Sequence, residues 1–367
     1  MKRTYHHTID TLIALHTIAL MTMLMLWCMP ITSYGQNNGY FIQLRDKNES
    51  PYSLSNPESY LSARAIERRL RQQIEIDQYD LPVNPAYING VEACGVKVKH
   101  SSKWLNGLIV FCDDENILED IKALPYIVSI EKTKEAVNGR YSIIKNMEST
   151  ISTNKNSSTE TQLEILNGNF MHQYGYTGQG IHIAVLDAGF LDVDNAMAFD
   201  RLFAENRMLG VKDFVDDDTP FFQTDNHGLH VLSILAGQIE NQFTGSAPQA
   251  SYYLFRTEDR LTEYPVEADY WVCAAELADS IGVDIIQSSL GYYYFDNPAM
   301  NYSPTQLNVS TRISKAATIA VSKGMVVVNS AGNEALNPWQ YIIMPADSPD
   351  VLTVGAIDNS GIRSPFS

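Results

Sequence analysis

Three short motifs hold, in chain order, an acid, a base and an amide. They are Asp187 in IAVLDAG (183–189), His227 in DNHGLH (225–230) and Asn333 in NSAGNE (329–334). A carboxylate can fix a histidine in one tautomer, the histidine can then act as a general base, and an amide can donate to a developing oxyanion. The residue types therefore predict acid–base catalysis with a stabilised oxyanion, as acyl transfer requires.

Each motif taken alone has an ordinary structural explanation. An aspartate at a strand end often caps a turn or a helix, and Asn333 could occupy a turn or a helix end. His227 and His230 could be a core histidine or metal ligands. A zinc site would need a further ligand cluster or the His-Glu-x-x-His spacing, which the sequence does not contain. Only the three motifs together favour catalysis.

The elements that must position these residues begin near residue 161, where apolar strands alternate with helices. The predicted strands are 181–186, 251–255, 283–288, 325–329 and 351–356, and the predicted helices are 230–237, 266–280 and 306–323. This alternation predicts an α/β fold, a parallel sheet with helices on both faces. Ligands bind such sheets beyond the carboxyl ends of the strands. Asp187, Ser289 and Asn333 follow strand ends, so we expect them at one edge.

Residues 36–135 form a separate, smaller unit in the predicted organisation. Its strands are 40–44, 95–99, 107–111 and 127–131, and its helices are 61–73 and 115–124. The order β-α-β-β-α-β predicts a small α+β domain of ferredoxin-like type. Its first helix carries Arg64, Arg68, Arg69 and Arg71, which we expect on a solvated face rather than in an anion site. Residues 136–160 are polar and aperiodic, and predict an exposed linker open to proteolysis.

Residues 1–35 have the pattern of a signal peptide. A basic start precedes the apolar run 12–29, and small residues precede Gln36, where cleavage is expected. An uncleaved anchor helix is the alternative, since the run is long enough to span a membrane. Pro30 ends the run and favours the signal. We therefore expect a secreted or cell-surface protein with no stable membrane span after cleavage.

The charge of the chain argues against one class of partner. The formal net charge of the chain is −17, of which −15 lies in residues 136–367. An acidic exported domain argues against nucleic-acid binding. It is compatible with structural calcium, although charge alone does not locate a site.

Three cysteines remain once the expected signal is removed. Cys94 and Cys112 flank a predicted hairpin, so a cross-strand disulfide and two unpaired thiols both remain open. Cys273 lies on an apolar helical face and is expected to be a small core residue.

From about Thr177 to the end, the chain resembles the subtilisin-like (S8, subtilase) serine peptidases. The resemblance is carried by YTGQG (176–180) before the Asp187 strand, NHGLHV (226–231), GSAP (245–248), SSLG (288–291) and NSAGNE (329–334). It implies that Asp187 is the triad acid, His227 the general base and Asn333 the oxyanion donor. His230 would be structural. Leu229 departs from the usual threonine without removing a catalytic group.

The same resemblance implies a substrate cleft and an inhibitor. Ser289, Leu290 and Gly291 would belong to the edge strand that pairs with an extended substrate, and Ala331 and Gly332 would wall the S1 pocket. Residues 40–131 resemble the propeptides of secreted bacterial subtilases, which fold as ferredoxin-like chaperones and block the cleft until they are removed.

The family carries its nucleophile in a Gly-Thr-Ser-x-x-x-Pro turn, and no such stretch occurs in the 367 residues. Ser246, Ser364 and Ser367 stand in other contexts. We therefore expect a chain truncated before its serine, an incomplete peptidase domain over 161–367, and little activity of this polypeptide alone. The expected function is endopeptidase cleavage of polypeptides, with no cofactor required for the chemistry. The alternative is a pseudoprotease or fragment that acts by binding or inhibition through residues 36–135.

Overall fold

The computed structural model describes residues 37–136, 159–217 and 219–367. They comprise an N-terminal domain, residues 39–134, and a C-terminal domain, residues 159–367. The expected signal segment and nearly all of the expected linker lie outside the described residues. No helix in the described ranges is both long and apolar enough to cross a membrane.

The N-terminal domain is one antiparallel sheet with helices. Its elements are β1 (Gly39–Leu44), η2 (Pro57–Ser59), α2 (Ala63–Gln72), α3 (Pro85–Glu92), β2 (Val98–Ser102), β3 (Gly107–Phe111), α4 (Glu115–Lys122) and β4 (Ile127–Lys134). The strand order β2-β3-β1-β4 is that of the expected ferredoxin-like pattern. The apolar core contains Ile42, Leu108 and Val91, the last from the unpredicted helix α3.

The predicted strand at 95–99 is wrong in its bounds, because the strand begins at Val98. Helix α3 ends near Ala93, and Gly95 follows with φ +104°. Glycine in this left-handed conformation is a common helix terminator. Residues 95–97 therefore follow the end of helix α3 and precede the strand, whereas the sequence predicts that the strand already begins at residue 95.

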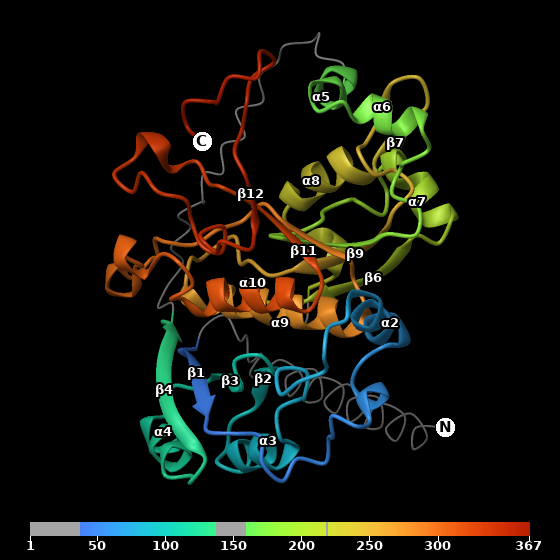
Figure 1. The fold of residues 1–367 in the computed structure, drawn as a ribbon. Helices are drawn as coiled ribbons and strands as arrows, with labels where there is room; N and C mark the ends of the chain where they lie inside the picture. Colours follow the sequence, from blue (N-terminus) through green and yellow to red (C-terminus); the bar gives the residue numbers. More distant parts are fainter. Residues whose placement is uncertain (1–36, 137–158, 218) are drawn as a thin grey trace, which may run out of the picture. The chain divides into compact units, whose positions relative to one another are not determined.

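The C-terminal domain is built on a six-stranded, wholly parallel sheet of order β12-β11-β10-β5-β9-β6 (Figure 1). The strands are β5 (His182–Asp187), β6 (Met208–Asp213), β9 (Ser251–Arg256), β10 (Ile285–Ser288), β11 (Val326–Ser330) and β12 (Leu352–Val354). The helices are α5 (Thr159–Ile165), α6 (Gly168–Gln173), α7 (Asp200–Ala204), α8 (His227–Ala236), α9 (Pro265–Ile281) and α10 (Arg312–Ser322). A short hairpin, β7 (Gln238–Ile239) and β8 (Phe243–Thr244), and several single 3-10 turns complete it.

Helices cover both faces of this sheet, as predicted. Helix α8 lies on one face, where Leu232 packs with Val185 of β5 and Leu254 of the neighbouring strand β9. Helices α9 and α10 lie side by side on the other face (Figure 1). There, Trp271 of α9 donates a hydrogen bond from Nε1 to the Ser288 hydroxyl, at 3.1 Å. Burial on both faces explains the near-continuous apolar sequence of the central strand β5.

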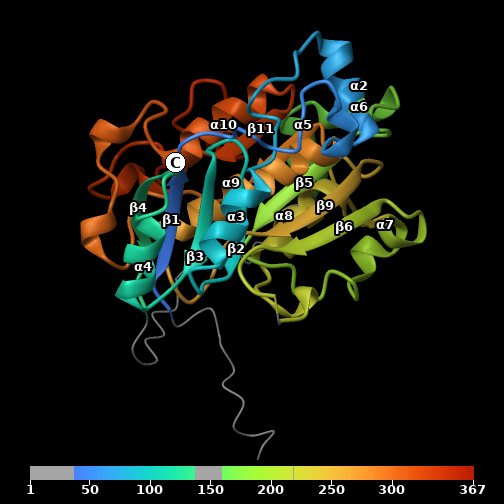
Figure 2. The same ribbon diagram turned by 90° about the horizontal axis from the view of Figure 1, so that it is seen from below.

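The N-terminal sheet packs on the outer side of α9 and α10 (Figure 2). Glu276 of α9 accepts hydrogen bonds from the Ser102 hydroxyl at 2.5 Å and from the backbone N–H groups of Lys103 and Trp104 at 2.7 and 3.0 Å. The buried carboxylate of Glu276 thus links the two domains by hydrogen bonds.

The solvated arginine face expected on α2 is wrong for two of its members. Arg68 and Arg69 are each 1% exposed, because α2 packs against α9 and both guanidinium groups pair with Asp279. Only Arg71, whose side chain is 62% exposed, matches the expectation.

All three described cysteines are unpaired. The thiols of Cys94 and Cys112 donate to the backbone oxygens of Gly90 and Asp114, at 3.5 and 3.4 Å. Cys273 is buried within α9, as predicted for a small core residue.

Candidate active site

Asp187 is the last residue of β5, in the middle of the parallel sheet. Its side chain is completely buried, and Oδ1 accepts a hydrogen bond from the Ala188 N–H at 2.8 Å. Burial raises the pKa of this carboxyl, and the hydrogen bond and charge of His227 oppose the rise. A buried acid at a strand end can act on a neighbouring side chain without contacting bulk water.

His227 is the first residue of α8 and lies directly beside that acid. Its Nδ1 is 2.8 Å from Oδ1 of Asp187, and its side chain is 24% exposed. Because a carboxylate only accepts hydrogen bonds, Nδ1 carries the proton and Nε2 is left as the base. Burial lowers the pKa of His227, but the hydrogen bond and charge of Asp187, with the charges of Asp225 and Glu258, raise it above 6.5.

Two glycines allow this close approach. The Gly228 N–H donates to the Gly189 carbonyl at 2.9 Å, which joins the start of α8 to the turn after β5. A Cβ on Gly228 would lie 2.4 Å from that carbonyl oxygen, and a Cβ on Gly189 would lie 2.4 Å from the Asp225 nitrogen. Any larger residue would push the helix away, so the glycines of both motifs set the distance between Asp187 and His227.

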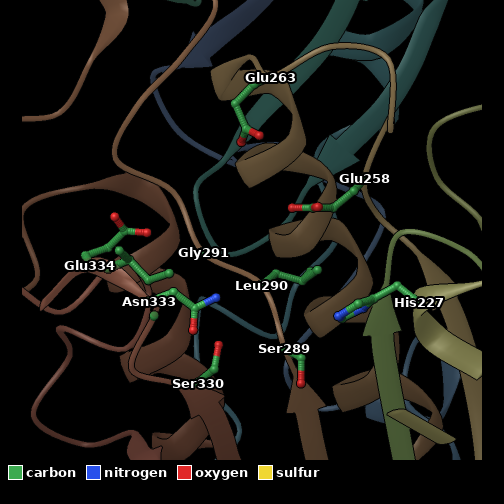
Figure 3. Close-up of a pocket in the computed structure, with 11 residues that line it drawn as sticks. His227, Glu258, Glu263, Ser289, Leu290, Gly291, Ser330, Asn333 and Glu334 are labelled. Atoms are coloured by element: carbon green, nitrogen blue, oxygen red, sulfur yellow. The ribbon is translucent and has the colours of Figure 1, made fainter. Parts of the chain in front are cut away.

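A cavity of about 380 Å³ opens beside His227 at the carboxyl edge of the sheet. It is lined by His227, Glu258, Glu263, Ser289, Leu290, Gly291, Ser330, Gly332, Asn333, Glu334 and Ile343. His227 and Asn333 lie on opposite sides of it, with the chain that carries Leu290 between them (Figure 3). The predicted base and amide therefore line one cavity at this edge of the sheet, and the predicted acid, Asp187, is buried next to the base without lining the cavity.

Asn333 owes its position to the turn after β11. Gly332 precedes it with φ +99°, a left-handed conformation that favours glycine. Asn333 begins a short 3-10 turn, η7 (Glu334–Leu336), but its side chain makes no capping hydrogen bond there. The amide instead extends toward the middle of the cavity (Figure 3). This geometry suits a donor to a bound oxygen better than a helix cap.

Most of the predicted substrate-binding residues also line the cavity. Ser289, Leu290 and Gly291 form one wall, and the Leu290 carbonyl is held by Nδ2 of Asn329 at 2.9 Å. Ala331 does not line the cavity; its N–H donates to the Val354 carbonyl at 2.9 Å and fixes the turn instead.

Two other residues of the histidine motif lie in different environments. Leu229 packs against the apolar cluster beneath α8, so its departure from threonine adds core contact. His230, for which a structural role is expected, is exposed on the surface of α8.

The sequence reasoning missed the acidic wall of the cavity. Glu258 lies two residues beyond the end of β9, so the strand-end argument that selects Asp187 could have selected it as well. Glu334 directly follows Asn333 in a motif already identified. Glu263 and Ile343 come from loops and carry no signal in the sequence.

One group of carboxylates within the described residues has the spacing of a cation site. Single oxygens of Glu258, Glu263 and Glu267 all lie within 4.8 Å of one another. Hard cations such as calcium prefer oxygen ligands of this kind. The structural calcium expected from the sequence remains a prediction, and these residues are where it would be tested.

A parallel sheet with an Asp–His pair at its carboxyl edge, facing an amide across a cleft, is one of the architectures on which catalytic triads occur. Two family models match the chain: the subtilase family over residues 178–367, and the peptidase S8 propeptide domain of Bacteroidota over residues 39–153. The first match covers more than half of the chain. The protein belongs to the subtilase family and carries a propeptide domain of the peptidase S8 type.

Curated relatives agree with this assignment. Subtilisin E of Bacillus subtilis (strain 168) is 30% identical over 201 residues, which cover 54% of this chain and 46% of that protein. The thermostable alkaline protease of Halalkalibacterium halodurans is 25% identical over 262 residues, covering 69% of this chain and 63% of that protein. The chain thus spans about half the length of the curated relatives it matches.

Among solved structures, the prenylagaramide maturation protease PagA matches with a TM-score of 0.40 and 25% identity, covering 55% of this chain and 62% of that chain.

Proposed function

We propose that the protein is a serine endopeptidase that hydrolyses peptide bonds through Asp187, His227 and a serine encoded beyond Ser367. The observation that supports this most directly is the 2.8 Å contact between His227 Nδ1 and the buried Asp187, with the imidazole facing a cavity that Asn333 also lines. A geometry of this kind supports a role in acyl transfer.

In the proposed reaction, His227 Nε2 takes the proton of the attacking serine hydroxyl and later donates it to the leaving amine. Asp187 holds the imidazole in the required tautomer and stabilises the imidazolium. Asn333 donates its amide to the oxyanion of the tetrahedral intermediate. The chain from Ser289 to Gly291 would bind the substrate backbone in extended form, and Gly332 would help to shape the pocket for the side chain next to the cut.

We further propose that residues 36–135 act as the protein's own inhibitor and are removed by cleavage within residues 136–160. The packing of the N-terminal sheet on α9 and α10, through Glu276 and Asp279, supports a specific docking of this domain. Export by the segment 1–35 would place the protein outside the cell or on its surface. The chemistry needs no cofactor, and calcium would be structural only.

The test is covalent labelling of the full-length protein, expressed from its complete reading frame, with a fluorophosphonate probe. We expect one labelled serine C-terminal to Ser367, and no labelling of Asp187→Asn or His227→Ala. Asn333→Ala should fold and lower kcat by about 10²–10³, the usual cost of removing an oxyanion donor. Glu240→Gln, an exposed site away from the cleft, is the matched control.

Labelling that persists in Asp187→Asn or His227→Ala would refute the residue assignment. A reading frame that closes at Ser367, with no labelling at all, would refute the peptidase and favour a protein that acts by binding through its N-terminal domain.

A further inference from the structure

The charged residues that line the cleft are almost all acidic. Glu258, Glu263 and Glu334 line the cavity together with His227, and within the described part of the chain no lysine or arginine lines it. Arg260, from the same loop as Glu258, pairs with Asp225 at 2.6 Å instead of lining the cavity. The cleft therefore presents a concentrated negative field to anything that enters it.

Glu258 and Glu263 come from the loop between β9 and α9, and their carboxylates converge. Glu258 is only 4% exposed and Glu263 is half-buried. Figure 3 shows both side chains on the same side of Leu290, with Glu258 nearer to it than Glu263. Oxygens of both lie within 4.8 Å of each other and of Glu267. Like charges so close together, and so little exposed to water, repel strongly, and a cation placed among them relieves that repulsion.

The three glutamates do not all have the same role. Glu267 accepts the Tyr264 N–H at 3.2 Å, in the capping box that starts α9, and it does not line the cavity. Glu258 and Glu263 do line it. The cation-attracting part of the cluster therefore faces the same space as His227 and Asn333.

A second, independent feature points into this cluster. Tyr292 is completely buried, and its hydroxyl makes no hydrogen bond of good geometry within the described part of the chain. Burial, then the charges of Glu258, Glu267 and Glu263, and a contact with the Glu258 carboxylate raise its pKa well above 10, so the neutral hydroxyl lies beside these carboxylates. The hydroxyl does not itself line the cavity, so it acts on the carboxylates rather than on an entering ligand.

We propose that this site binds a lysine or arginine side chain of the substrate, held by Glu258 and Glu263 with the Tyr292 hydroxyl beside them. The proposal rests on the peptidase function proposed above. It favours a peptide cation over a metal ion because Glu258 and Glu263 share one cavity with His227, Asn333 and the Ser289–Gly291 wall. A peptide laid along that wall would carry one of its side chains past both carboxylates. The same field would reject an acidic side chain at that position.

The test compares matched fluorogenic peptides cleaved by the full-length protein. An otherwise uncharged peptide receives a single arginine at each position in turn on either side of the scissile bond, and the same set is made with glutamine. We expect one position at which arginine raises kcat/KM about tenfold over glutamine, in the range for a partly buried charge pair. Glu258→Gln and Glu263→Gln should each bring this ratio toward one, while Glu240→Gln should leave it unchanged.

A charge reversal separates recognition from damage to the fold. Glu263→Lys should turn the preference at that position toward glutamate, which an unfolded variant cannot do. No preference at any position, or a preference that survives both glutamine variants, overturns the proposal. Calcium binding is the other result that would overturn it. If one calcium ion binds and requires Glu258 and Glu263, and if its removal by chelation leaves the arginine preference unaltered, then the arginine preference does not arise at this site.

Failure of the peptidase function would be distinguishable from failure of the site. If no peptide is cleaved and no serine is labelled, binding of the arginine and glutamine peptides is measured by fluorescence anisotropy. Tighter binding of the arginine peptide that is lost in Glu258→Gln and Glu263→Gln supports the site without the reaction. Equal binding of both peptides overturns it.

Discussion

Arg69 of the N-terminal domain and Asp279 of α9 form a buried ion pair, in which Nη2 lies 2.8 and 2.9 Å from the two carboxylate oxygens. Arg68 and Lys103 approach the same carboxylate at 2.6 and 2.9 Å. Burial alone would raise the pKa of Asp279, but the charges of Lys103, Arg69 and Arg68 lower it below 3.8. One acid on the peptidase domain therefore pairs with three cations of the N-terminal domain, and Asp80 supplies a second carboxylate to Arg69.

Asp279→Asn should weaken the docking of the N-terminal domain. The substitution leaves Arg68 and Arg69, each 1% exposed, with less compensating charge. Breaking a buried pair in this way typically costs about 3–5 kcal/mol. Urea unfolding of the chain should show the loss, and Asp350→Asn, at an exposed position, should stay within about 0.5 kcal/mol of the parent. Equal unfolding midpoints for both variants would contradict this account.

The pH dependence of the contact between Asp279 and its three cations follows from the direction in which the pKa of Asp279 is shifted. Because the folded pKa of Asp279 is lowered, its contribution to stability is complete above 3.8 and is lost as the pH falls through the folded value. Mild acid alone should therefore not release the N-terminal domain through Asp279.

The sequence predicts the central strands and the site residues at their ends because both follow local rules. The apolar run of β5 predicts a buried strand, and parallel strands place Asp187 and Asn333 at one edge. Strand β6 was not predicted because it is an edge strand, whose residues are exposed or half-buried and do not form an apolar run. Local sequence patterns therefore predict those elements whose structure depends on residues close to them in the sequence.

The buried arginines show the limit of such reasoning. Arg69 pairs with an aspartate 210 residues away, and nothing near α2 predicts that partner. Helix α9 is misleading for the same reason: its charged residues Glu276 and Asp279 suggest a solvated face, yet both are buried under the N-terminal domain. Within the site, Glu263 also depends on how a loop folds back over the cleft. The burial of these charged residues depends on contacts between segments far apart in the sequence, which local patterns do not predict.

Gly228→Ala should separate the catalytic pair. The new Cβ would lie 2.4 Å from the Gly189 carbonyl oxygen, a backbone atom that cannot yield easily. Overpacking of this kind typically costs about 1–3 kcal/mol. We expect a lower unfolding midpoint, together with loss of fluorophosphonate labelling in the full-length protein.

The matched control is Gly210→Ala in β6, where the new Cβ would meet the Tyr253 ring at an ordinary 3.4 Å. It should fold and react like the parent. Full labelling of Gly228→Ala would show that the helix can shift without disturbing Asp187 and His227.

His227 should titrate above pH 6.5, and Asp187→Asn should lower its pKa. Burial acts to lower this pKa, and the hydrogen bond and charge of Asp187 are what raise it. The stability gained from the imidazolium is therefore complete below pH 6.5 and is lost as the pH rises through the pKa of His227 in the folded protein. The neutral imidazole that catalysis needs as a base forms over the same pH interval. NMR titration of the imidazole resonances, assigned with His227→Gln, measures both pKa values. His100, buried and held to a pKa of about 4, is an internal reference that should not respond. A His227 pKa unchanged by Asp187→Asn would show that Asp187 does not control the base.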